Sequence, residues 1–169
     1  PIRSAKTIVV VMNTISRTAA ERGGVHPLYI HHISEKFAIL IERAASLSVL
    51  KQLGEAMVYE YCAAVRDFST RHYSLLVKKA VNYIHMHLEE DLSLSIIADE
   101  LYVNASHLSR KCKAETSKSI VDYINQKRIE EAKRYLERGN VSITEVALMV
   151  GFNDLNYFSR VFKKTTSLS

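Results

Sequence analysis

The chain has 169 residues, of which 47% are hydrophobic and 24% charged, and its formal net charge is +5. This mixture is typical of a globular protein with a buried core and excludes a disordered chain. The longest apolar run, residues 8–12, is too short to cross a membrane. The two cysteines lie far apart and fit neither a disulfide framework nor a zinc motif, so we expect a cytoplasmic protein without membrane contact.

Apolar residues follow a helical period through almost the whole chain, which predicts an all-α protein. The first predicted helix ends at the glycine pair 23–24, and one face of it carries Ile8, Met12, Ile15 and Ala19. The chain begins at Pro1 and not at Met, and we expect it to be part of a longer protein.

Two serines are the predicted starts of the next helices: Ser34 for the second and Ser48 for the third. The polar stretch STRHYS, residues 69–74, then predicts a boundary between domains. We therefore expect a helical module over residues 1–72 and a second domain over residues 73–169.

The second domain contains an internal repeat. Its opening helix is predicted to reach Leu88, and two short segments follow with the same apolar spacing, one starting at Leu94 and the other at Ile143. After each segment come a short polar turn and a sequence of an apolar residue, serine and arginine. Each copy predicts two helices joined by a tight turn, the helix-turn-helix unit that binds DNA through its second helix.

A single long helix is predicted between the two copies, over residues 120–139. Its apolar stripe runs from Ile120 to Leu136, and Gly139 is placed to cap it. About 18 residues would give a rod about 27 Å long. Such a rod could hold two DNA-reading helices about one helical turn of DNA, roughly 34 Å, apart.

Positive charge gathers on the two candidate recognition helices. Residues 104–118 carry a net +3 and residues 154–169 a net +2, whereas residues 88–101 carry −5. Phosphate neutralisation supplies much of the affinity for nucleic acid, so this distribution favours double-stranded DNA as the partner. Asn104 and Asp154 are predicted to cap these two helices.

Side chains left facing outward on the two helices are the candidate contacts. Arg110 and Arg160 are the leading base readers because arginine can pair with guanine through two hydrogen bonds. The other candidate base contacts are Ser106, Ser109, Leu155, Asn156 and Ser159, and the candidate phosphate contacts are Lys113, Lys163 and Lys164. The inward faces are predicted to be Leu108 with Cys112, and Phe158 with Phe162.

The stretch SITEVALMVGFNDLNYFSRVFKKTT closely resembles the signature of the AraC/XylS family of bacterial transcription regulators, and LSLSIIADELYVNASHLSR and KRIEEAKRYL extend the resemblance back to about residue 75. It implies two helix-turn-helix units, at about residues 93–116 and 142–166, that read adjacent major-groove segments. The family's base-contacting positions map onto the seven base contacts named above. Ser117 and Ser167 stand where the family usually has glycine.

Residues 1–72 are similar, over RTAAERGGV, to the helical segment that precedes this domain in some Firmicute members of the family. Dimerisation and signal relay both remain open for this module, so a homodimer through residues 1–72 and RNA polymerase are further candidate partners. The alternative to a DNA-binding regulator is a helical protein-interaction module with residues 1–72 as its working part.

Other chemistries find little support. His31 and His32 are adjacent and His85 and His87 are two apart, so neither pair shares a helix face and no metal site is predicted. The chain lacks a glycine-rich phosphate loop, an HExxH motif and a Ser/His/Asp arrangement, and Cys112 lies between two lysines on an inward face. We therefore expect neither an enzyme nor a cofactor.

Overall fold

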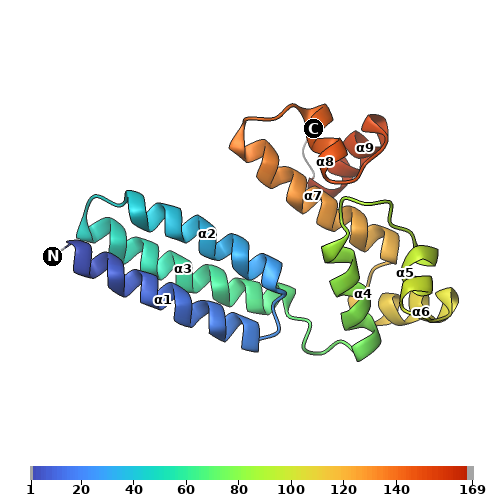
Figure 1. The fold of residues 1–169 in the computed structure, drawn as a ribbon, viewed down its shortest axis with the longest axis horizontal. Coiled ribbons are helices and arrows are strands. Elements are labelled where there is room, and N and C mark those ends of the chain that lie inside the picture. The colour runs from blue at the N-terminus through green and yellow to red at the C-terminus, as the bar shows by residue number, and fades with distance from the viewer. Residues whose placement is uncertain (1, 167–169) are drawn as a thin grey trace. The chain divides into compact units, whose positions relative to one another are not determined.

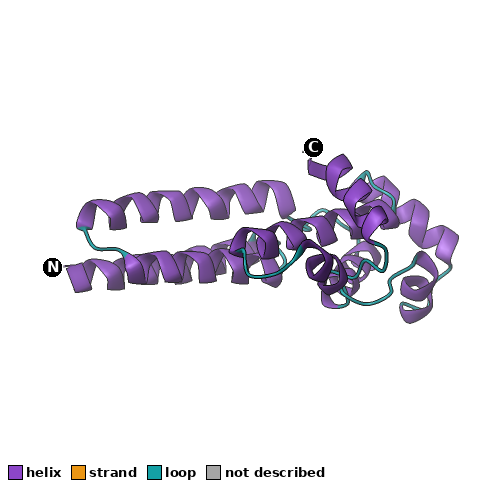
Figure 2. Cartoon of the chain, turned by 90° about the horizontal axis from the view of Figure 1, so that it is seen from above, coloured by secondary structure: helices purple, strands orange, loops and turns teal. Residues whose placement is uncertain are grey.

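The computed structural model describes residues 2–166, apart from the side chain of Arg138. Within these residues every regular element is an α-helix, and nine helices follow one another along the chain (Figures 1 and 2). The predicted all-α class is therefore confirmed. The chain divides into two compact units, Pro1–His72 and Tyr73–Ser169, which are described separately.

The N-terminal unit is a bundle of three helices, α1 (Ile2–Arg22), α2 (Pro27–Arg43) and α3 (Leu47–Phe68), which lie side by side in Figure 1. As predicted, α1 ends before the glycine pair, and Gly24 has a φ of +87°. The core between the helices is apolar, and its largest fully buried side chains are Phe37, Ile41, Leu50 and Met57.

The apolar face that the sequence displays on α1 is not the face that the bundle buries. Ile8 and Ile15 are 62% and 63% exposed, whereas Val9, Asn13 and Ala20 are buried. The inward face includes a polar residue because Asn13 has buried partners: it accepts a hydrogen bond from Tyr61 Oη at 2.7 Å and donates one to Ser34 Oγ at 3.2 Å. An apolar face of α1 is consequently left on the surface.

Two predicted helix starts in this unit are wrong. Ser34 lies within α2, where it binds Asn13, and the helix begins at Pro27 with His26 as its cap. Proline suits the first position of a helix because the N–H that it lacks has no partner there. Ser46, and not Ser48, caps α3, and its Oγ accepts the Val49 N–H at 3.2 Å.

The C-terminal unit contains the other six helices of the described chain, α4 (Leu75–Met86), α5 (Leu94–Glu100), α6 (Ala105–Thr116), α7 (Ile120–Arg138), α8 (Ile143–Met149) and α9 (Leu155–Thr166). The first of these ends before Leu88, which packs against the core from the following turn. The two repeats become the helix pairs α5–α6 and α8–α9, with α7 between them in the sequence.

One helix contributes to two separate hydrophobic cores in this unit. The first half of α7 buries Ile120 and Ile124 against α4, α5 and α6. Its second half buries Ile129 and Ala132 against α8 and α9. Gly139 caps α7 in a left-handed conformation, as predicted, with a φ of +71°. Both recognition helices are therefore held by the same rod.

Candidate nucleic-acid interface

The two repeats share the same turn geometry. The Val103 N–H donates to Ala98 O at 2.9 Å, and the Phe152 N–H donates to Ala147 O at the same distance. The residue before each donor has a positive φ, +55° at Tyr102 and +90° at Gly151. Glycine adopts this conformation freely, whereas at Tyr102, which is 95% exposed, it costs about 1–2 kcal/mol of backbone strain.

The first recognition helix, α6, packs against the core through its buried face and is capped at its first turn. Asn104 Oδ1 accepts the His107 N–H at 3.1 Å, which is the predicted cap. Leu108 and Cys112 are buried, also as predicted. The predicted contact residues on the other face are accessible: Ser106, Arg110 and Lys113 are exposed and Ser109 is half-buried.

The single carboxylate on α6, that of Glu115, stabilises the contact between α6 and the start of α4. Glu115 Oε2 accepts the backbone N–H of Ser74, at the start of α4, at 2.7 Å. This hydrogen bond, together with Lys111 Nζ at 3.3 Å, holds the pKa of Glu115 below its usual value. The glutamate is therefore engaged with α4 and Lys111, and Arg110 and Lys113 remain as the outward cations of the helix.

The second recognition helix, α9, is built in the same way. Asp154 Oδ1 accepts the N–H groups of Asn156 at 2.7 Å and Tyr157 at 3.0 Å, as expected of a cap. Phe158 is buried as predicted, but Val161 is the second buried anchor and Phe162 is only half-buried. The predicted inward pair is thus corrected by one position.

The predicted contacts on α9 face the surface. Leu155, Asn156, Arg160, Lys163 and Lys164 are exposed, and Ser159 is half-buried. The guanidinium of Arg160 lies over the ring of Tyr157, 5.4 Å from its centroid, which orients the arginine without burying it. Of the two serines that replace the family's glycine, Ser117 ends α6 with a φ of +60°, and Ser167 lies outside the described residues.

A cleft of about 730 Å³ brings the two repeats together. Lys113 from α6 and Arg160 and Lys164 from α9 line it, along with Lys118 from the turn before α7. Four cations from separate parts of the sequence thus surround one open cleft, whose lining includes a single carboxylate, that of Asp122. An arrangement of this kind suits the phosphates of a nucleic acid.

Several polar residues that line this cleft were not predicted from the sequence, among them Lys118, Asn125 and Gln126. Lys118 Nζ hydrogen-bonds to Gln126 Oε1, and the Asn125 side-chain amide donates to Tyr157 Oη at 2.8 Å. The second bond ties the linker helix to the recognition helix α9. No signal for Asn125 and Gln126 existed in the sequence, because both lie off the apolar stripe of the predicted linker helix, where polar residues are ordinary.

Arg128 is buried and joins the turn after α4 to the second repeat. It is 8% exposed, and it donates from Nε to Leu88 O at 2.9 Å and from Nη2 to Glu90 O at 2.6 Å. Its guanidinium also lies 5.6 Å from the centroid of the Phe152 ring, in the second turn. Burial lowers the pKa of Arg128, but an arginine stays charged at any physiological pH.

Within residues 2–166 no group of three or more His, Cys, Asp or Glu side chains is arranged to hold a metal ion. His87 Nδ1 lies 2.8 Å from Glu90 Oε1, and His85 is buried near the Tyr123 ring. No helix in this described part of the chain has the length and apolar character needed to cross a membrane.

Comparison with known proteins agrees with this geometry. A family model described as "Helix-turn-helix domain" matches residues 97–169. The chain is 29% identical over 154 residues to the HTH-type transcriptional activator Btr of Bacillus subtilis, covering 85% of this chain and 28% of that protein. It is 39% identical over 92 residues to an uncharacterized HTH-type transcriptional regulator of Pseudoalteromonas carrageenovora, covering 54% of each.

Solved structures with the same fold are also similar in sequence. The C-terminal domain of AraT, a response regulator from Geobacillus stearothermophilus, is 34% identical, with a TM-score of 0.56 over 58% of this chain and 82% of that one. The C-terminal domain of the response regulator yesN from Fusobacterium nucleatum is 31% identical, with a TM-score of 0.53 over 57% of this chain and all of that one. The chain spans about half or less of the curated relatives named above.

Proposed function

The chain belongs to the AraC/XylS family of bacterial transcription regulators, and from this premise we propose that α6 and α9 enter adjacent major-groove segments of one DNA duplex. The observation that carries the proposal is the cleft in which Lys113 of one recognition helix and Arg160 of the other face a common space. Cations from two repeats that line one cleft can engage the same duplex.

In this proposal the seven accessible residues on the two helices read the bases. Arg110 and Arg160 pair with guanine, and Asn156 pairs with adenine. Leu155, which is 41% exposed, contacts a thymine methyl group, and Ser106, Ser109 and Ser159 contact base edges. Lys113, Lys163 and Lys164 bind phosphates, and Lys118 joins them from its place in the cleft.

The experiment selects bound duplexes from a random DNA pool and measures their affinity by fluorescence anisotropy over a salt series. We expect Arg110→Ala or Arg160→Ala to weaken binding roughly 5- to 150-fold and to relax the preference at one base position. Lys163→Ala should weaken binding to all sequences alike and reduce the salt slope by about one.

Lys36→Ala is the matched control, because Lys36 is a surface cation of the N-terminal unit, paired with Glu60 at 2.7 Å. It should leave DNA affinity unchanged. Equal losses in Lys36→Ala and Arg160→Ala would contradict specific reading. If the chain binds no DNA but binds a protein partner with an affinity that does not change with salt concentration, the alternative of a helical interaction module would be favoured.

We further propose that the chain acts in the cytoplasm, by binding and not by catalysis. We also propose two partners: RNA polymerase, and a second copy bound through residues 1–72. The similarity to Btr over 154 residues is longer than the C-terminal unit, so it extends into the N-terminal unit. That extent supports a shared role for the two units in regulation.

A further inference from the structure

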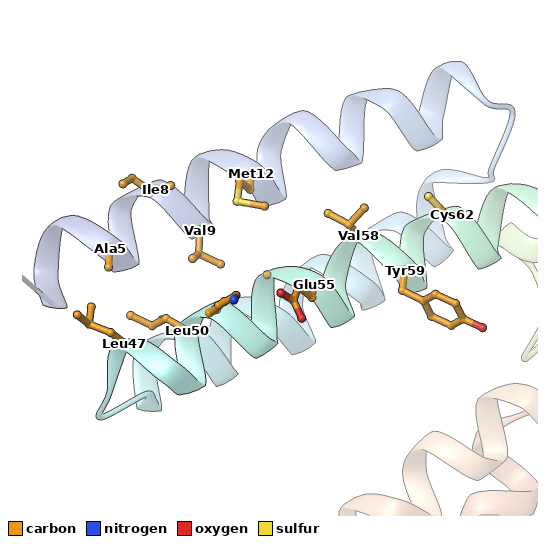
Figure 3. A pocket seen from close by; sticks show the side chains of 12 residues that line it. Ala5, Ile8, Val9, Met12, Leu47, Leu50, Glu55, Val58, Tyr59 and Cys62 are labelled. Atoms are coloured by element: carbon orange, nitrogen blue, oxygen red, sulfur yellow. The ribbon is translucent and has the colours of Figure 1, made fainter.

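An open apolar groove runs between α1 and α3 of the N-terminal unit (Figure 3). Its volume is about 760 Å³, and Figure 3 shows Ile8 and Met12 on one wall and Leu47, Val58 and Cys62 on the other. Of the residues that line it, Ile8 is 62% exposed, Leu47 53% and Val58 40%. A contiguous apolar surface of this kind usually marks an interaction site.

The groove contains two charged side chains, and they have opposite signs. Lys51 and Glu55 stand one helical turn apart on α3 and line the groove. Neither makes a hydrogen bond or ion pair within residues 2–166, whereas the outward pair Lys36–Glu60 is closed at 2.7 Å. The groove therefore presents one unpaired cation and one unpaired anion to whatever occupies it.

We propose that the occupant is a second copy of this chain, with the two α3 helices antiparallel across the groove. A two-fold axis between residues 51 and 55 places Lys51 of each copy beside Glu55 of the other, so the interface closes two ion pairs. A parallel arrangement would instead place lysine against lysine and glutamate against glutamate. The charge pattern thus selects both a self-complementary partner and its direction.

The shape of α3 fits this arrangement. Residues 47, 51, 54 and 58 follow the alternating spacing of four and three that forms a seam between paired helices. Gly54 is buried on the side of α3 that faces Met12 of α1, so at this position of the seam the wall of the groove is formed by Met12. With 22 residues, α3 is about 33 Å long, which allows several turns of contact.

The inference rests on the self-association proposed for residues 1–72 and is independent of DNA reading by the C-terminal unit. The test is sedimentation equilibrium of the 169-residue chain, from about 1 to 100 µM, without DNA. We expect a monomer–dimer equilibrium that Lys51→Glu or Glu55→Lys alone weakens roughly tenfold or more, since each creates two like-charge contacts. The double exchange K51E/E55K should restore the dimer.

Lys36→Glu is the matched control, because it reverses a charge on α2 outside the groove, and it should leave the dimer unchanged. Iodoacetamide provides a second measurement, because Cys62 is exposed and lines the groove. Its alkylation should slow as the protein concentration rises.

A chain that stays monomeric over the whole concentration range, or a double exchange that fails to restore association, would overturn the proposal. DNA affinity measured on the same variants separates the two hypotheses. If the chain is monomeric but binds its selected duplex, only the proposed dimer is refuted. If it is dimeric but binds no duplex, only the proposed reading of bases is refuted.

Discussion

The side chain of Arg128 contacts two separate turns of the C-terminal unit. Its two hydrogen bonds hold the chain just after α4, and its guanidinium packs on Phe152 in the turn between α8 and α9. An ideal Cβ on Gly151 would lie 2.8 Å from Nη2 of this arginine, so glycine is required for the close approach. One buried cation thus joins the turn after α4 to the second repeat through backbone and ring contacts.

Replacing Arg128 with alanine should destabilise the C-terminal unit. The change leaves two carbonyls without their charged donor, and we expect a loss of about 2–4 kcal/mol in the free energy of unfolding. Urea denaturation followed by circular dichroism measures it. Arg134→Ala is the control, because Arg134 forms a half-exposed ion pair with Glu131 on the same helix, and should cost about 1 kcal/mol or less. Equal losses would contradict the role given to Arg128.

The two cysteines should differ sharply in reactivity. Burial, and to a lesser degree Glu115, raises the pKa of Cys112 to about 11, so its thiol stays protonated and unreactive at pH 8. Cys62 is exposed. We expect iodoacetamide at low protein concentration to alkylate Cys62 first, and Cys112 to react only on unfolding or as the pH approaches its pKa. Mass spectrometry of the labelled peptides checks this, and equal labelling at pH 8 would contradict it.

At the scale of the helices, the caps predicted from the sequence agree with the structure in the C-terminal unit, whereas helix starts predicted in the N-terminal unit do not. Asn104, Asp154 and Gly139 act where predicted because capping is a local interaction between a side chain or φ angle and the nearest backbone. The face of α1 depends on Asn13, whose partner Tyr61 comes 48 residues later. The apolar pattern alone cannot tell such a face from its neighbour.

The candidate site divides in the same way. The exposure of Arg110 and Arg160 follows from the buried positions on their own helices, which the sequence displays. The meeting of Lys113, Lys118 and Arg160 at one cleft depends on how α7 packs into two cores, and no periodicity contains that information. Their roles on DNA stay predictions.

The glycines after α7 and α8 allow a matched test of the turns. Both have a positive φ, but nothing lies within 4 Å of a Cβ built on Gly139, whereas one on Gly151 meets Arg128 and Leu88 O, each at 2.8 Å. Gly139→Ala should cost about 1 kcal/mol from backbone strain alone. Gly151→Ala should cost about 3 kcal/mol, because it also displaces the arginine. Thermal or urea unfolding of the two variants measures both losses of stability. Equal losses would show that backbone strain alone accounts for the cost at Gly151.

On the scale of the whole molecule, two units of different character share the chain. The C-terminal unit carries the cleft lined by four cations, and the N-terminal unit carries the open apolar groove. DNA reading is therefore proposed for one unit and self-association for the other. Because each has its own core, a variant in one can be interpreted without assuming damage to the other.

Spacing of the DNA segments should matter strongly, because both readers are attached to a single helix of 19 residues, about 28 Å long. Inserting about 5 bp between the two selected segments turns the second to the opposite side of the duplex, and affinity should fall to that of one segment. Inserting about 10 bp returns the second segment to the same side of the duplex but leaves it farther from the first, so affinity should stay low. Anisotropy titrations test this, and recovery at the longer spacing would contradict a rigid link.

The polar middle of α7, between its two cores, also suggests how this protein could be re-engineered. Each residue added to a helix swings everything after it by about 100° and advances it by about 1.5 Å. A single inserted residue would therefore misalign the second reader, whereas seven would return it to within about 20° of its original direction. Lengthening this one helix in two-turn steps is thus the route to a regulator that recognises more widely separated operator halves.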